Sequence, residues 1–368
     1  MALGGLAAVY VTMALLTEGG TYSFMTVGRR SAEIMGSLEG KAAAAVNLAG
    51  SEPQRTFAPA SAAIARTGVT LRLGKCINIG GYLETGEQGE QLPFPESRFN
   101  FLKQGGFSTV RIPVRWDVHA AHMPPYKIEP EWMATVKEYA SRATRSGLNV
   151  IVDIHHFRDL DRDPAGNRER YISFWRQISE AFADAPDNVW FDLLNEPGGE
   201  ITDSILQGLY NEALREIRRT NPTRNVLVTA RGGHTETLAN LMVPDDPHVI
   251  PAFHTYAPLA FTHQGASWTS DKYPLGTHFG SDADYRYLNR ELNITSQFMT
   301  RTGRVPVIVE FGAIRYAGMD DRIRYYRAIS SAFASLGVQS CVWSDTIFPI
   351  WDDNGWNHAL KDAIETTR

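Results

Sequence analysis

The stretch Val189–Pro197, VWFDLLNEP, is an apolar, β-forming run that ends in the polar residues Asn195 and Glu196. Runs of this kind are typical of strands that are buried on both faces, as in a parallel sheet. Seven further runs along the chain show the same character: Leu73–Gly81, Thr109–Val114, Asn149–His156, Asn225–Ala230, His248–Tyr256, Val305–Gly312 and Ser340–Asp345.

Amphipathic segments separate these runs, and several end in a glycine that favours a helix stop, such as Gly147 and Gly337. Alternation of strand and helix predicts a parallel sheet with crossover helices, and eight strands is the number in a (β/α)₈ TIM barrel. A doubly wound open sheet is the alternative, but its glycine-rich phosphate turn is absent from the sequence. The helical segments are Glu131–Ser146, Arg170–Ala183, Asp203–Thr220, Asp284–Arg301 and Asp320–Leu336.

The chain has 368 residues, enough for one barrel and an extension. We expect residues 67–368 to form the barrel and residues 1–66 to form an apolar segment followed by a low-complexity extension. Residues 1–16 are apolar, but the first basic residues are Arg29 and Arg30, so a basic region does not precede them. This stretch is interpreted as an atypical export signal, a membrane anchor, or the result of a start codon upstream of the true one. Export is favoured, which predicts a secreted, periplasmic or cell-surface protein.

Charge and cysteine content narrow the class of protein. The formal net charge is −5 and no long run of like charge occurs, so a nucleic-acid partner is not expected. The two cysteines, Cys76 and Cys341, are too few for a metal cluster or a disulfide framework. They fall on the first and last expected strands and would be neighbours if the barrel closes, but buried free thiols are the favoured interpretation. We expect a monomer.

Polar residues cluster at the ends of the expected strands. In barrel enzymes the active site lies at the carboxyl ends of the strands, so residues that are far apart in the sequence should converge on one mouth. Glu196 ends the fourth strand and Glu310 ends the seventh, across the mouth from one another. The other polar strand residues are Arg111, His155, His156, Asn195, Arg231, His254, Tyr256 and Trp343.

A pair of carboxyl groups is the machinery of glycoside hydrolysis. We expect Glu196 to act as acid and base and Glu310 as the nucleophile. Arg111 is placed to keep Glu310 ionised, because a nearby cation favours the charged form of a carboxyl. His254 and Tyr256 project from one strand face and are expected to hydrogen-bond the two carboxylates.

The sequence disfavours a metal-dependent hydrolase, an aldolase and a barrel that only binds carbohydrate. His155 and His156 are adjacent, and adjacent residues of a strand face opposite sides, which argues against a shared metal ion. A strand-end lysine for an aldolase and a His/Asp cluster for a metal-dependent hydrolase are also missing, so no cofactor or metal is expected. A barrel that only binds carbohydrate would not need both glutamates.

The same residues carry a resemblance to glycoside hydrolase family 5, the cellulases, mannanases and related β-glycanases. It runs from about Lys75 to Leu360, with a likeness to bacterial endoglucanases that have some mannanase activity. The motifs are GGFSTVRIPVRW (Gly105–Trp116), NVIVDIHHF (Asn149–Phe157), FDLLNEP (Phe191–Pro197), FHTYAPLAFTHQGASW (Phe253–Trp268) and PVIVEFG (Pro306–Gly312).

The resemblance implies a TIM barrel, a retaining mechanism without cofactor, and roles for particular positions. Glu196 matches the family's acid/base and Glu310 its nucleophile. The implied supporting residues are Arg111, His155, Asn195, His254 and Tyr256, and the implied substrate-binding residues are Asn78, Glu84, Trp116, His156, Trp268 and Trp343.

Three departures from the related members affect the sugar-binding side. Gly81 stands where they often have Asn, and Ser344 stands where they have an acidic residue. The segment Thr346–Trp356 is peculiar to this chain and is expected either to add stacking aromatics or to close the barrel.

The resulting expectation is an endo-β-1,4-glucanase that degrades a polysaccharide. A β-mannanase, a β-1,3-glucanase or a β-glucosidase of the same family is the alternative, since loop shape decides between internal cutting and release of single sugars. A non-catalytic carbohydrate-binding barrel is the alternative of another class.

Overall fold

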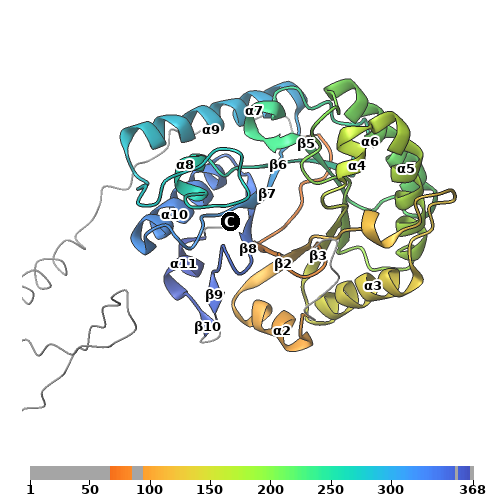
Figure 1. Ribbon diagram of the computed structural model, residues 1–368, viewed down its shortest axis with the longest axis horizontal. Helices are drawn as coiled ribbons and strands as arrows, with labels where there is room; N and C mark the ends of the chain where they lie inside the picture. The colour runs from red at the N-terminus through yellow and green to blue at the C-terminus, as the bar shows by residue number, and fades with distance from the viewer. Residues whose placement is uncertain (1–66, 85–93, 353–354, 365–368) are drawn as a thin grey trace, which may run out of the picture. The chain divides into compact units, whose positions relative to one another are not determined.

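The computed structural model describes residues 67–84, 94–352 and 355–364. Within them, eight parallel strands form a closed barrel in which each strand pairs with the next and the first pairs with the last (Figure 1). The (β/α)₈ barrel predicted from the sequence is thereby confirmed. The strands are β1 (Lys75–Ile79), β2 (Phe107–Ile112), β3 (Asn149–Asp153), β4 (Val189–Asp192), β5 (Val226–His234), β6 (Val249–His254), β7 (Val307–Phe311) and β8 (Gln339–Ser344).

Helices connect the strands and surround the barrel (Figure 1). Local sequence fixes their starts: the Thr202 side chain caps the helix that begins at Asp203, and Ser281 and Asp284 form a capping box. The helices are α2 (Glu96–Gln104), the 3-10 turn η2 (Asp117–His119), α3 (Pro130–Arg145), α4 (Arg158–Arg162), α5 (Pro164–Ala181), α6 (Asp203–Thr220), α7 (Thr235–Leu238), α8 (Leu259–Thr262), α9 (Asp282–Thr302), α10 (Met319–Ser335) and α11 (His358–Ala363).

The strands are buried on both faces, as their apolar sequences predicted. Ile151, Leu227 and Val309 belong to a cluster of strand residues that fills the inside of the barrel. The alternate strand residues, such as Val150 and Phe253, pack outward against the helices. Full burial of one such aliphatic side chain contributes about 1.5–3 kcal/mol, so the two layers together hold the strand ends in place.

A disulfide closes the barrel. Cys76 on β1 and Cys341 on β8 are register partners with Cα atoms 4.3 Å apart, and their sulfur atoms are bonded. The interpretation of these residues as free thiols is therefore wrong. The reason is geometric, because barrel closure places the two side chains directly beside each other inside a fully buried layer. The bond spans a sequence separation of 265, and the chain-entropy model assigns a cross-link of such length up to roughly 5 kcal/mol of stability.

The first part of the segment after β8 borders the cavity, and its later part packs against α2. Phe348 and Ile347 line the cavity at the carboxyl ends of the strands. Further on, the short hairpin of β9 (Trp351–Asp352) and β10 (Gly355–Trp356) packs against α2, where Trp356 stacks on Phe101 with ring centroids 4.4 Å apart. The barrel itself is closed by the pairing of β1 with β8 and not by this segment, and a stacking role toward a sugar stays a prediction for Phe348.

The predicted apolar segment and low-complexity extension, residues 1–66, lie outside the described residues. Within the described part of the chain, no helix has the length and hydropathy needed to span a bilayer.

Candidate active site

A cavity of about 550 Å³ lies at the carboxyl ends of the barrel strands. The two glutamates singled out in the sequence both line it, one from the loop after β4 and the other from β7. The other predicted site residues that line the cavity are Glu84, His155, His156, Asn195, His254, Tyr256, Trp268 and Trp343.

Glu196 is held in a strained loop. Its φ angle is 44°, in the left-handed region that side chains other than glycine rarely adopt. The preceding Asn195 donates its backbone N–H to the carbonyl of Ile154, at 2.9 Å, which anchors the loop to the end of β3. The Glu196 side chain is 43% exposed, so its carboxylate is open to the cavity. Backbone strain of this kind persists where surrounding contacts over-determine it, and it is concentrated at functional sites.

Glu310 lies in a different environment, on β7, where its side chain is 7% exposed. Arg111 donates to one of its oxygens at 2.7 Å, and the Tyr256 hydroxyl donates to the other at 3.0 Å. Each oxygen of this buried carboxylate therefore has a hydrogen-bond donor, and one of the two donors is charged.

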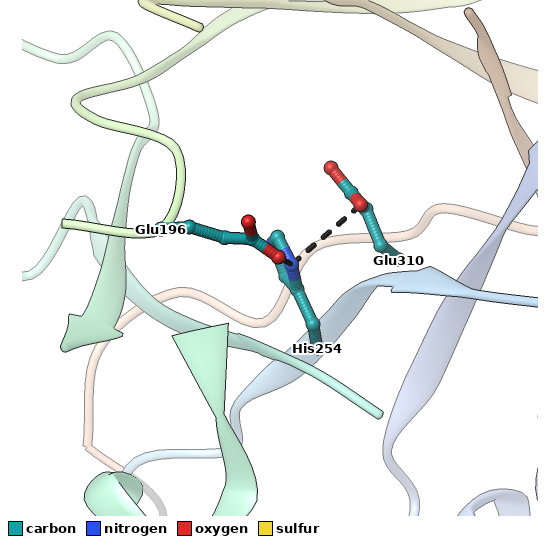
Figure 2. A group of neighbouring side chains, drawn as sticks. All are labelled: Glu196, His254 and Glu310. Atoms are coloured by element: carbon teal, nitrogen blue, oxygen red, sulfur yellow. Dashed lines mark hydrogen bonds and ion pairs between the residues drawn. The ribbon is translucent and has the colours of Figure 1, made fainter. Parts of the chain in front are cut away.

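His254 connects the two glutamates. Its Nδ1 lies 2.9 Å from an oxygen of Glu196 and 3.6 Å from an oxygen of Glu310 (Figure 2). One oxygen of each glutamate and this nitrogen all lie within 4.8 Å of one another. Carboxyl pairs in retaining glycosidases stand about 5–5.5 Å apart, and those in inverting enzymes about 6.5–9.5 Å apart. The observed spacing fits the retaining class.

Three groups at this distance are also a candidate metal site, but their partners argue against it. The oxygens already accept hydrogen bonds from Arg111, Tyr256 and His254. The guanidinium at 2.7 Å from Glu310 would repel a second cation. The residues therefore fit a hydrogen-bonded pair better than a set of metal ligands.

His254 and Glu196 shift each other's pKa in opposite directions. Burial acts to raise the pKa of Glu196, but the hydrogen bond and charge of His254 outweigh it and hold this pKa below its ordinary value. Burial acts to lower the pKa of His254, but the carboxylates of Glu310 and Glu196 outweigh it and raise this pKa. Each member of the pair thus favours the charged form of the other.

Beneath Glu310, Arg111 is the centre of a buried polar network. Its guanidinium contacts Asp153 at 2.7 Å, Asp192 at 2.9 Å and the side-chain oxygen of Asn195 at 2.9 Å. Sequence reasoning missed both aspartates, because each is a single polar residue inside an apolar run. Their position next to the strand ends in DIHH and FDLLNEP was the available signal. The network fixes the direction of Arg111, which is fully buried.

The two adjacent histidines do not face opposite sides. His155 and His156 both line the cavity, with ring centroids 4.2 Å apart. The strand ends at Asp153, and a φ of 53° at His156 turns its side chain toward that of His155. Burial lowers the pKa of each ring to about 3, so both are neutral hydrogen-bonding groups at ordinary pH.

Acidic and aromatic side chains line the part of the cavity near β8 and β1. The Trp343 indole donates a hydrogen bond to the carboxylate of Asp345, at 3.0 Å. An acidic residue therefore lies two positions after this tryptophan, while Ser344 is the residue directly after it. Glu84 accepts hydrogen bonds from the backbone of Gly81 and Tyr82, and burial raises its pKa to about 7. Asp345 and Glu84 thus supply acidic groups to this part of the cavity, although Ser344 does not.

Two predicted substrate-binding residues do not reach the cavity. Asn78 is fully buried and hydrogen-bonds the carbonyl of Val309 at 2.7 Å and the Arg111 guanidinium at 3.0 Å. Trp116 is also fully buried, with its indole donating to the carbonyl of Asp153 at 2.8 Å. Neither offers a free face or polar atom to a sugar, so the substrate-binding prediction for both is wrong. Trp268, in contrast, is 53% exposed and lines the cavity.

Comparison with known proteins gives a consistent family. Residues 89–347 match the model of the cellulase family, glycosyl hydrolase family 5. Endoglucanase H of Acetivibrio thermocellus is 32% identical over 77% of the chain, and the aligned region is 31% of that relative's length. Endoglucanase A of Ruminococcus albus is 30% identical over 70% of the chain and 78% of the relative.

A solved structure shares the fold over nearly its whole length. The endoglucanase Cel5A of Thermotoga maritima is 33% identical, with a TM-score of 0.76 over 79% of this chain and 97% of that one. The same enzyme has been crystallised with cellobiose and with mannotriose.

Proposed function

The chain belongs to the cellulase family, glycosyl hydrolase family 5, and from this membership and the site we propose that it is a retaining endo-β-1,4-glucanase. Glu196 is the acid and base, and Glu310 is the nucleophile. The observation that carries the proposal is the spacing of the two carboxylates, whose nearer oxygens lie within 4.8 Å.

The proposed reaction has two displacements. In the first, Glu310 attacks the anomeric carbon while Glu196 protonates the leaving glycosidic oxygen, giving a covalent glycosyl-enzyme. In the second, the ionised Glu196 takes a proton from water, which attacks the same carbon and restores Glu310. The sugar leaves with its original configuration because the carbon has been inverted twice.

The His254 contact supports the change of protonation that this cycle needs. A sugar in the cavity removes water from the 43%-exposed Glu196 side chain. Loss of hydration penalises the charged form of Glu196, which favours the protonated carboxyl that the first step needs. Glu310 is already screened from solvent and keeps its guanidinium partner, so a bound sugar changes its surroundings less.

The remaining cavity residues are assigned to the sugar. Arg111 and Tyr256 orient Glu310, and His155, His156 and Asn195 are hydrogen-bonding groups for the sugar at the cleaved bond. Trp343 and Trp268 provide aromatic faces, and Glu84 provides an acceptor for hydroxyl groups. An intact pair of glutamates with two different environments is not needed by a barrel that only binds carbohydrate.

A β-1,4-glucan is the favoured substrate because the named relatives are endoglucanases. The first of them is about three times longer than the aligned region, so its activity as a whole protein is transferred here only as a proposal. Mannan or glucomannan is the second candidate, since the Thermotoga relative has been crystallised with mannotriose as well as cellobiose. A β-1,3-glucanase or β-glucosidase has no specific observation in its favour.

Product analysis tests the proposal. We expect the wild type to release oligosaccharides from carboxymethyl-cellulose, mixed-linkage glucan or glucomannan, and laminarin to stay intact. Proton NMR recorded during the first minutes should show the β-anomer of the new reducing end before mutarotation. The α-anomer as first product would exclude the retaining mechanism, and the absence of any product would favour a binding protein.

We also place the protein outside the cytoplasm, as an exported monomer whose catalytic domain is residues 67–368. The buried disulfide supports this location, because such bonds persist mainly in oxidising compartments. Gel filtration of the purified chain and fractionation of source cells test the two statements separately.

Gly233 should be required for activity more than for folding. A Cβ atom there would lie 2.9 Å from Nδ1 of His254 and 3.1 Å from Cγ of Glu196, at a φ of 72°. We expect Gly233→Ala to lower kcat roughly 10- to 100-fold, because displacement of the His254–Glu196 pair by a fraction of an ångström misplaces the proton donor. Steady-state kinetics on an aryl β-cellobioside measures the effect.

The matched control for this variant is Gly106→Ala. Gly106 has a φ of 89° and nothing within 4 Å of an added Cβ, so it carries the same backbone strain without the contact. Both variants should lose similar thermal stability, and only Gly233→Ala should lose turnover. Equal turnover in the two would show that the close approach has no bearing on the reaction.

A further inference from the structure

A buried carboxylate that the proposed mechanism does not use borders the cavity next to the end of β6, where His254 and Tyr256 lie. Glu291 belongs to α9 and is 3% exposed. Its Oε1 accepts a hydrogen bond from the hydroxyl of Thr235 at 2.7 Å, and both of its oxygens lie 3.0 Å from the hydroxyl of Thr255. One side chain of α9 thus contacts the segments that follow β5 and β6, next to α7 (Figure 1).

Thr255 directly follows β6 and sits between His254 and Tyr256, the two residues that contact the glutamates. Successive side chains of an extended chain point to opposite faces, so Thr255 reaches toward α9 while His254 contacts Glu196. Tyr256 contacts Glu310 from the same face as His254. The Thr255 backbone N–H also donates to the carbonyl of Glu310 at 3.0 Å. A shift of Thr255 would therefore move the partners of both glutamates together.

Burial of Glu291 is costly. Among the described residues its hydrogen-bond donors are two neutral hydroxyls, and no basic side chain pairs with it. Burial raises the pKa of Glu291 to about 7, although the hydrogen bonds from the two hydroxyls act to lower it. The negative charge of nearby Glu236 adds to the increase. An apolar side chain of similar size would avoid this cost, so stability does not account for a carboxylate at this place.

We propose that Glu291 is a positioning residue for the proposed glycosidase reaction. Through the hydroxyls of Thr235 and Thr255 it fixes the end of β6, and with it the hydrogen bonds from His254 to Glu196 and from Tyr256 to Glu310. The inference rests on the proposed function. Loss of this tether should lower kcat with little change in KM, because the tether holds groups that act on the bond being broken.

The sharpest test removes one hydroxyl. In Thr255→Val we expect kcat on a 4-nitrophenyl β-cellobioside to fall roughly 10- to 100-fold, with KM within about twofold of the wild type. Thr255→Ser, which restores the hydroxyl, should recover most of the loss. Glu291→Gln keeps the size of the side chain but weakens both contacts. It should also lower kcat with little change in KM, but by a smaller factor than Thr255→Val.

Thr295→Val is the matched control. Thr295 is buried on the same helix, and its hydroxyl donates to the backbone carbonyl of Glu291, at 2.9 Å. This variant also removes a buried threonine hydroxyl, but it leaves both side-chain contacts of Glu291 in place, so kcat should stay at the wild-type value. Wild-type kcat in a folded Thr255→Val, or an equal loss in Thr295→Val, would overturn the proposal.

A second readout does not depend on turnover. The apparent pKa of His254, followed by NMR, should move toward its ordinary value in Thr255→Val and stay raised in Thr295→Val. An unchanged His254 titration in Thr255→Val would overturn the positioning role, whatever the activity. Absence of turnover in the wild type itself would instead reject the proposed function.

Discussion

Glu310→Ala is expected to lower turnover of glucan and of aryl β-cellobiosides by roughly 10⁴- to 10⁶-fold, the scale on which loss of a covalent nucleophile is felt. The side chain contributes the only protein atom proposed to bond the anomeric carbon. Its partners Arg111 and Tyr256 would be left around an empty space, with a guanidinium that favours an anion there. Measurement of kcat with a sensitive chromogenic substrate gives the size of the loss.

Sodium azide provides the control for this variant. The small anion can enter the space left by the carboxylate and attack the same carbon from the same side. With one displacement in place of two, the product should be the glycosyl azide of inverted configuration, seen by NMR. Full activity without azide, or an azide product of retained configuration, would remove Glu310 from the nucleophile's role.

Glu196→Gln should have the second largest effect, and its size should depend on the leaving group. On glucan, whose leaving alcohol needs a proton, we expect a loss of about 10²- to 10⁴-fold. On 2,4-dinitrophenyl β-cellobioside the first step needs no proton and should stay fast. The second step still needs a base, so rapid release of dinitrophenol should be followed by slow turnover.

Glu200→Gln is the matched control for the acid and base. Glu200 lies in the same loop and is exposed, so the variant makes the same chemical change outside the cavity. It should keep wild-type kinetics on both substrates. A Glu196→Gln enzyme that loses the same factor on both substrates would point to a damaged site rather than to a missing proton donor.

The barrel could be predicted from sequence because each strand has its own local apolar pattern, which can be recognised without knowing the other strands. A run such as Val305–Gly312 is apolar on both faces, and its length and flanking glycine are those of a strand. The end of β5 was not predicted to extend to His234, because Gly232 and Gly233 interrupt its apolar pattern. The short helix α7 was likewise missed, since one turn carries no periodicity.

The placement of Glu196, Glu310, His254 and Tyr256 around one cavity followed from topology, since strand ends of a closed barrel meet at one mouth. The site predictions that were wrong depend on the direction of side chains, above all in the loops that follow the strands. Trp116 follows β2 in a loop that turns its ring into the core, and no periodic pattern encodes that turn. The disulfide required the register of β1 against β8, which a single sequence does not contain.

The bond between Cys76 and Cys341 also determines what a protease can do to this protein. The two cysteines are 265 residues apart, so nearly all the connecting loops of the barrel lie between them. A cut in any one of these loops leaves two fragments that remain covalently joined and held by the shared core. The nicked chain should migrate near full length on a non-reducing gel and separate into two pieces only when thiol is added.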